Sequence, residues 1–232
     1  MFLYVDIETL PNPDYGKIVR PTLQDLKCPK TLKKKESIEA WWKSDEREDD
    51  IEELYQKKVN EFRKTALNPW EGQIFCIAWA KDDDPIDVVW SNDEKELLEK
   101  FEHELQTRYE RKITDSMSVA TFVGYNLRNF DNTLLRLKSI KHKLSWLTQV
   151  LPTRKYHDRI EDVMEMALIT TRITADKYVS LDLVSKFFGL DGKGDIDGSM
   201  VYDMWKAGKK QEIADYCKED VSKARTLHKM LR

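Results

Sequence analysis

Short apolar blocks alternate with amphipathic stretches along this chain. In the first block, residues 2–8, even-numbered and odd-numbered side chains face opposite sides of a strand, and both sides begin apolar. This pattern is typical of a strand in the middle of a sheet. Two further blocks, 73–80 and 86–90, flank a polar turn that contains a proline, and they predict a hairpin.

Helical spacing follows the hairpin. Leucines and aromatic residues recur every three or four positions after Ser91, which we expect to cap this helix with Glu94 as its capping-box partner. A β-prone run at 118–123 then leads into a second helix, which begins at Asn129 or Asp131.

Two late segments also have helical periodicity. Residues 181–188 form a short amphipathic stretch closed by Gly189, and residues 211–231 form a longer one. The element order is therefore three strands, a helix, a strand and further helices, which indicates an α/β fold.

A segment that breaks this pattern, residues 11–72, predicts an insertion after the first strand of a single domain spanning 1–232. It contains a basic run at 33–35 and an acidic run at 45–50. Residues 51–66 have helical spacing, so part of the insertion should form an amphipathic helix that docks somewhere. The basic run is either a contact for nucleic acid or a solvated face.

The composition narrows the class of protein. Hydrophobic residues make up 41% of the 232 residues, enough for a core, and no run of about 18 apolar residues predicts a membrane span. The first residues resemble a strand rather than a leader, so we expect an intracellular, cytoplasmic protein. A net charge of -3 gives no general attraction for nucleic acid, so phosphate contacts would need local patches or bound cations.

Two acidic residues, Asp6 and Glu8, share one side of the first expected strand. Their Cα atoms would lie roughly 7 Å apart, so both carboxylates can reach one hard cation. The alternative is a polar strand end, because two acids at this spacing are common by chance.

A second acidic position follows the β-prone run. Asp131 comes after Asn126 in the stretch 124–131, at the start of an expected helix. It is either a functional carboxylate or a first-turn acid that the helix dipole favours, and Asn126 is either functional or a turn residue.

On the last expected helix, Tyr216 and Asp220 are four residues apart, which places phenol and carboxylate side by side. Both border the apolar stripe of that helix, and a bordering tyrosine is commonly a packing residue. The order of all three motifs along the chain is therefore more informative than any one of them.

Taken together, the three motifs resemble those of the DnaQ-like, or DEDD, 3′-5′ exonucleases. The motifs are D-x-E at residues 6–8, an N-x(3)-F-D stretch at 126–131 and Y-x-x-x-D at 216–220. The last spacing resembles the tyrosine-type subgroup, since the histidine type would need histidine at Asp215. Segments 65–69, 180–190 and 195–199 are also similar to the predicted polymerase-B-like exonucleases of phage and bacteria.

This resemblance implies a ribonuclease H-like fold, in which helices flank a mixed five-stranded sheet. It also implies that Asp6, Glu8, Asp131 and Asp220 bind two Mg²⁺ or Mn²⁺ ions, with Asp6 shared between them, and that Tyr216 orients and helps to deprotonate the attacking water. Crowded carboxylates repel one another, and divalent cations relieve this repulsion while offering charge to a phosphodiester.

The resemblance places the terminal nucleotide against Thr9 and Leu10, with Asn126 close to the substrate. Phe130 is either a stacking wedge or a core residue. Asp162 follows a fifth apolar stretch and either supports the site or is a solvated acid.

The function that this resemblance implies is removal of nucleotides from the 3′ end of single-stranded DNA, with release of nucleoside 5′-monophosphates. An exoribonuclease is one rival, because the same carboxylates serve either sugar. A catalytically silent nucleic-acid-binding scaffold is the other. The expected partners are a nucleic acid 3′ end and, through the insertion, a replication or repair protein.

Overall fold

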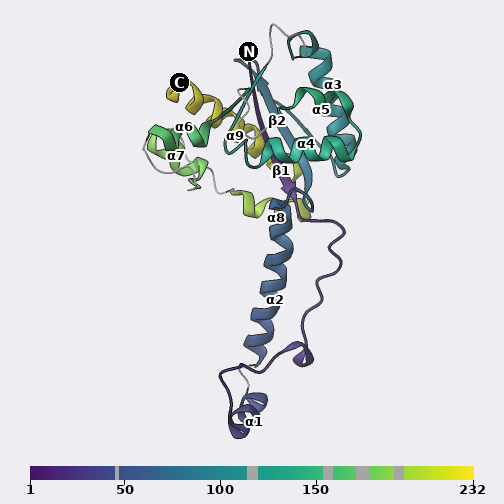
Figure 1. The fold of residues 1–232 in the computed structure, drawn as a ribbon, viewed down its shortest axis with the longest axis vertical. Helices are drawn as coiled ribbons and strands as arrows, with labels where there is room; N and C mark the ends of the chain where they lie inside the picture. The colour runs from purple at the N-terminus through teal and green to yellow at the C-terminus, as the bar shows by residue number, and fades with distance from the viewer. Residues whose placement is uncertain (45–46, 114–119, 154–158, 171–177, 191–195) are drawn as a thin grey trace.

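A mixed five-stranded sheet forms the centre of the protein (Figure 1), as predicted. The computed structural model describes residues 1–44, 47–113, 120–153, 159–170, 178–190 and 196–232. The strands lie in the order β3-β2-β1-β4-β5, where β1 pairs antiparallel with β2 and parallel with β4. Their bounds are β1 Phe2–Leu10, β2 Gln73–Lys81, β3 Asp87–Trp90, β4 Thr121–Gly124 and β5 Ile160–Asp162.

The alternation along β1 divides its side chains between two cores. Leu3, Val5 and Ile7 are buried on one face of the sheet, whereas Tyr4 is buried on the other. β2 is apolar along almost its whole length and buried from Ile74 to Ala80, as expected of a strand covered on both faces.

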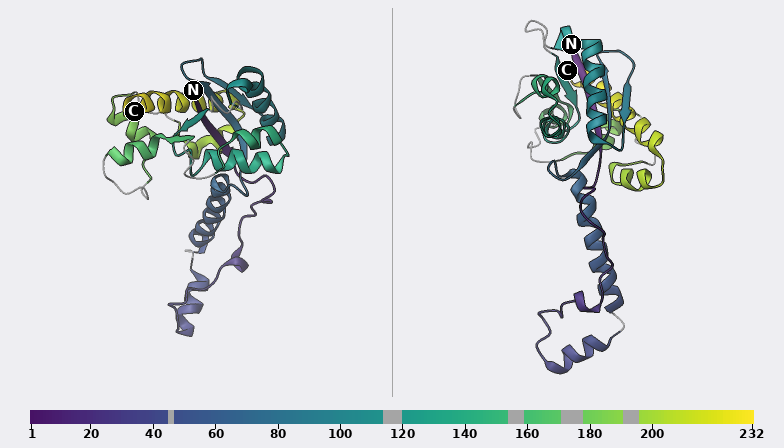
Figure 2. Two further views of the ribbon diagram at one scale, coloured as in Figure 1. Left: turned by 45° about the horizontal axis from the view of Figure 1, so that its top comes forward. Right: turned by 90° about the vertical axis from the view of Figure 1, so that its right-hand side faces the viewer.

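Helices cover both faces of the sheet (Figure 2). The core on the Leu3 face includes residues of α3 (Glu94–Ile113), α4 (Asp131–Lys141) and α5 (Ser145–Val150). The core on the Tyr4 face includes residues of α6 (Val163–Thr170), α7 (Leu181–Phe187), α8 (Val201–Lys206) and α9 (Lys210–Leu231). In the described ranges, no helix combines the length and apolar character that crossing a membrane requires.

The segment between β1 and β2 forms an arm that projects from this body (Figure 1). It contains the 3-10 turn η1 (Leu23–Asp25), α1 (Lys35–Lys43), α2 (Arg47–Lys64) and the 3-10 turn η2 (Thr65–Leu67). The predicted helix is present as α2, and its last turn packs on the body, where the rings of Phe62 and Tyr202 lie 5.2 Å apart. The apolar side of α2 meets the arm's own chain, since Tyr15 packs on Phe62 at 5.3 Å and Arg20 lies over Tyr55.

The start of α3 differs from the prediction. Asp93 caps the helix, because its Oδ1 accepts hydrogen bonds from the backbone N–H groups of Lys95 and Glu96. Ser91 lies two residues earlier and donates its hydroxyl hydrogen bond to Glu96. The expected capping box of Ser91 and Glu94 is therefore wrong.

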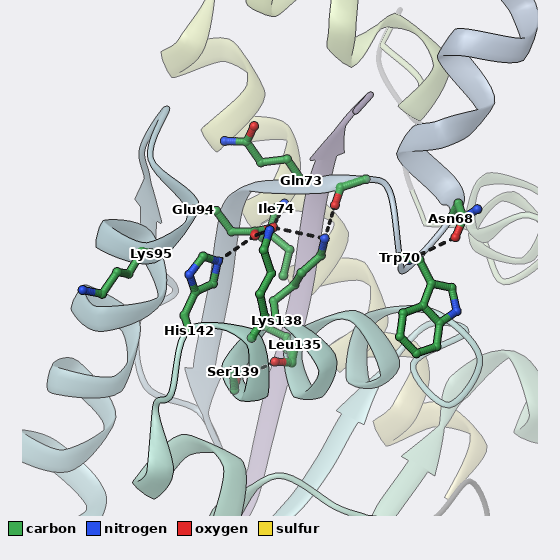
Figure 3. A network of polar contacts seen from close by, with 12 residues as sticks. Asn68, Trp70, Gln73, Ile74, Glu94, Lys95, Leu135, Lys138, Ser139 and His142 are labelled. Atoms are coloured by element: carbon green, nitrogen blue, oxygen red, sulfur yellow. Dashed lines mark hydrogen bonds and ion pairs between the residues drawn. The ribbon is translucent and has the colours of Figure 1, made fainter. Parts of the chain in front are cut away.

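Glu94 instead joins α3 to β2 and α4 inside the protein (Figure 3). Its carboxylate accepts from the backbone N–H of Ile74 at 2.9 Å and lies 2.8 Å from His142 Nε2. The Lys138 ammonium lies 3.7 Å from the same carboxylate and donates to the carbonyl of Gly72. This buried network fixes the start of β2 against α4, and its satisfied donors offset the cost of burying the charges.

Candidate active site

Three carboxylates from the first strand and the last helix meet in a cleft. Asp6 and Glu8 project from the side of β1 that faces α9, and Asp220 projects from α9. Their oxygen atoms lie within 4.8 Å of one another. The pairing of β1 with β2 shifts register between Glu8 and Thr9, which marks a bulge beside this cluster.

Asp131 approaches the cluster from the other side of β1. Strand β4 pairs with β1 only as far as Tyr4, so beyond that residue β1 has no strand partner on this side among the described residues. The carboxylate of Asp131, the first residue of α4, accepts a hydrogen bond from the backbone N–H of Ile7 at 3.1 Å. Asp131 lies outside the group of three, but its charge acts on Asp6.

The loop that carries Asp131 is held by a buried acid from β5. Oδ1 of Asp162 accepts from the backbone N–H of Asn126 and Oδ2 from that of Arg128, both at 3.0 Å. Gly124 lets this loop start close to β1, because a Cβ there would lie 2.7 Å from the carbonyl oxygen of Val5. Asp162 therefore supports the site and is not a solvated acid.

Burial and mutual repulsion hold protons on Asp6 and Asp131 when no cation is present. Burial, followed by the charges of Asp131, Asp220 and Glu8, raises the pKa of Asp6 well above its ordinary value. Burial, with the charges of Asp162 and Asp220, raises the pKa of Asp131 to about 7. A cluster of hard oxygen donors in this electrostatic state fits divalent cations such as Mg²⁺ and Mn²⁺.

Tyr216 lies beside the cluster, one helical turn before Asp220. It is buried, and its phenol is hydrogen-bonded to Asp220. Burial, followed by the charges of Glu8, Asp220 and Asp6, raises the phenol pKa far above its ordinary value. Without cations, the side chain is therefore a neutral hydrogen-bond donor at physiological pH.

The residues predicted to contact substrate divide between the cleft and the core. The cleft, of about 1290 Å³, is lined by Thr9, Asn126 and Phe130 together with the carboxylates and Tyr216. Phe130 also packs against the core on the Leu3 face, so it belongs to both. The Leu10 side chain is buried in the core on the Tyr4 face, and Leu10 is not among the residues that line the cleft.

Several other cleft residues carry no motif that would reveal them in the sequence. Tyr125, Tyr178 and Tyr202 add aromatic surface, and the end of α2 contributes Asn60, Arg63 and Lys64. Residues 60–64 are part of a charged helix whose position next to the carboxylates depends on the tertiary fold. The similar segment 195–199 reaches the cleft through 196–199, while Asp195 lies outside the described residues.

An acidic cleft beside the central strand of a mixed sheet, with carboxylates from the first strand and the last helix, forms a candidate metal-binding site on a ribonuclease H-like α/β fold. Residues 60–228 match the family described as a predicted 3′-5′ exonuclease related to the exonuclease domain of PolB, so this chain belongs to that family. The predicted DnaQ-like exonuclease is confirmed, and enzymes of this superfamily generally use divalent metals. The match includes Asp131, Tyr216 and Asp220 but begins after β1, so the three-dimensional structure is what brings Asp6 and Glu8 to them.

Solved structures support the fold. A family B DNA polymerase from the hyperthermophilic archaeon Pyrobaculum calidifontis aligns with a TM-score of 0.53 and 16% sequence identity, over 99% of this chain. The aligned region is 24% of that polymerase, so this chain spans about a quarter of its length. No curated protein matches the sequence.

Proposed function

We propose that this protein removes nucleotides from the 3′ end of single-stranded DNA and releases nucleoside 5′-monophosphates. Asp6, Glu8, Asp131 and Asp220 would hold two Mg²⁺ or Mn²⁺ ions, and Tyr216 would orient the attacking water. The observation that carries the proposal is the convergence of three carboxylates within 4.8 Å in the cleft of a chain from an exonuclease family. Bound cations would neutralise these carboxylates and supply positive charge to the phosphodiester.

The walls of the cleft favour a single strand. Tyr125, Phe130, Tyr178 and Tyr202 line it, and Tyr178 is 72% exposed. Unpaired bases can stack on such rings, whereas bases within a duplex are already stacked on each other. The tyrosine-type assignment and the single domain with an inserted arm are parts of the same proposal. Contact between the arm and a replication or repair protein stays a prediction.

The direct test uses a 5′-labelled DNA oligonucleotide of about 20 nucleotides and an RNA of the same sequence. With Mn²⁺, we expect the DNA to shorten progressively from its 3′ end, and we expect EDTA or a blocked 3′ end to stop the reaction. Faster shortening of the RNA would favour the exoribonuclease instead. DNA and RNA that stay intact over a range of pH and salt would leave the scaffold as the better description.

The raised carboxyl pKa values predict that stability and cation binding depend on pH. A folded-state pKa of about 7 for Asp131, against about 4 in the unfolded chain, means that the cation-free protein loses stability as pH rises from 4 to 7. A cation must displace this proton, so the Mn²⁺-induced rise in melting temperature should increase between pH 5.5 and 7.5. Thermal melts with Mn²⁺ and with EDTA at each pH measure this difference. A rise that is the same at every pH would contradict the assignment of Asp131 as a ligand.

A further inference from the structure

The end of α2 forms one wall of the cleft that contains the carboxylates. Asn60, Arg63 and Lys64 line this wall, and the rest of α2 continues outward from the body (Figure 1). A polymer chain whose end lies at the carboxylates would therefore meet α2 next, on this side of the cleft.

One side of α2 presents an exposed polar stripe, formed by Lys57, Asn60 and Lys64. Their spacing of three and four residues aligns them along the helix, with about 10 Å of axial rise between the two lysines. The apolar residues Tyr55 and Phe62 contact Arg20 and Tyr15 of the arm, respectively. They therefore leave the stripe uncovered.

Lys64 lines the cleft and Lys57 lies outside it, and both differ in their pairing from two other cations of the cleft lining. Arg63 donates two hydrogen bonds to Asp203, at 2.7 and 2.8 Å, and Lys186 lies 2.8 Å from Asp182. Within the described part of the chain, neither Lys57 nor Lys64 has a carboxylate partner. Their charges are thus available to an anionic ligand next to a cleft rich in acids.

The stripe also has a defined outer end. Glu53 and Asp49 continue the same line of α2 beyond Lys57, at spacings of four residues, and both are exposed. A polyanion would be repelled there, so the surface that attracts it ends at Lys57; within the stripe, the exposed Glu61 is the one acid beside the two lysines.

We propose that Lys57, Asn60 and Lys64 bind the sugar-phosphate backbone of the substrate strand, on the 5′ side of the nucleotide being removed. This inference rests on the proposed function, which places the 3′ end at the carboxylates. The stripe is a positioning surface, because it holds the strand and does not contact the reacting phosphate.

The test compares Lys57→Gln/Lys64→Gln with a matched control, Lys30→Gln/Lys43→Gln, which removes the same charge from exposed residues elsewhere in the arm. Two substrates are used with Mn²⁺: a single-stranded DNA of about 20 nucleotides, and the p-nitrophenyl ester of thymidine 5′-monophosphate, which has no upstream phosphate. For the stripe variant, we expect kcat/KM on the DNA to fall about tenfold through KM, with hydrolysis of the ester unchanged. The control should match the wild type on both substrates.

Binding gives a second readout that does not depend on cleavage. In fluorescence anisotropy with the same DNA, loss of two phosphate contacts should reduce the slope of log affinity against log salt by about 1.4. An equal loss on DNA and ester, or no loss on DNA, would overturn the inference. If the wild type cleaves neither substrate, the proposed function fails, and an unchanged salt slope would then reject the stripe as well.

Discussion

Replacing Asp6 with asparagine should lower the rate of 3′-end cleavage at least a hundredfold. The amide keeps the shape of the side chain but removes one negative charge from the group formed with Glu8 and Asp220. A hundredfold loss corresponds to about 2.7 kcal/mol of transition-state stabilisation. Loss of a carboxylate that is expected to bind both cations should cost at least this much. Initial rates on a labelled oligonucleotide measure the effect.

The same substitution should stabilise the cation-free protein. Because the folded-state pKa of Asp6 lies well above its unfolded value, ionised Asp6 destabilises the fold above pH 4. Asparagine lacks this penalty, and the Cys217 thiol, 3.4 Å from Oδ2 of Asp6, keeps an oxygen acceptor. At pH 8 with EDTA, we expect the melting temperature to rise by about 2–4 °C, the shift that about 1 kcal/mol gives in a domain of this size.

Asp215→Asn is the matched control for this experiment. Asp215 is an exposed acid on α9, hydrogen-bonded to Gln211, and it lies next to Tyr216 in sequence but outside the cleft lining. It should leave both the rate and the cation-free melting temperature close to those of the wild type. Residual activity of the Asp6 variant above about 1% would show that Asp6 is not the shared ligand.

Local periodicity predicted the elements that build the site. The alternation in β1 placed Asp6 and Glu8 on one side, and the α9 pattern placed Asp220 one turn after Tyr216. These are short-range features, because side-chain direction within a strand or helix follows from residue spacing alone. The structure then shows that these two elements are neighbours across the core on the Tyr4 face.

The features that the sequence missed depend on long-range contacts. Asp162 binds backbone groups 34 and 36 residues earlier, so its burial could not be inferred from its neighbours in the chain. Glu94 likewise accepts from Ile74, 20 residues away, and this contact replaced the predicted capping box. The helical spacing of α2 predicted the helix but not the partner of its apolar side. That partner includes the arm's own chain, where Tyr15 packs on Phe62.

Leu10 shows what the alternation of side chains along a strand does not predict. Even-numbered residues of β1 face α9, and Tyr4 and Leu10 are both buried in the core on that face. Asp6 and Glu8 lie between them and line the cleft. The pattern gives the face of the sheet on which a side chain lies, but only the packing of helices on that face separates cleft from core.

Removing one oxygen atom, in Tyr216→Phe, should reduce kcat about a hundredfold and leave KM and Mn²⁺ binding unchanged. The ring would remain in the core on the Tyr4 face, and all four carboxylates would remain in place. A positioned donor or acceptor for the attacking water typically contributes a factor of about 10² to 10⁴. Parallel loss of Mn²⁺ binding would contradict this division of roles.

The control for the lost hydroxyl is Tyr4→Phe. Tyr4 also joins β1 to α9, through a hydrogen bond of 3.0 Å to His228, but it lies outside the cleft lining. We expect this variant to lose about 1 kcal/mol of stability and to retain its activity. If Tyr4→Phe were as slow as Tyr216→Phe, loss of any hydrogen bond between β1 and α9 would lower the rate. The effect would then not be specific to the Tyr216 hydroxyl.

The pH profile separates the two roles predicted for Tyr216. Burial is the first cause of the raised phenol pKa and persists when cations neutralise the carboxylates, so the neutral hydroxyl should orient the water throughout pH 6–9. The ratio of wild-type to Tyr216→Phe rates should then be constant over that range. A ratio that increases tenfold per pH unit would instead identify a phenolate base, and the orienting role would be rejected.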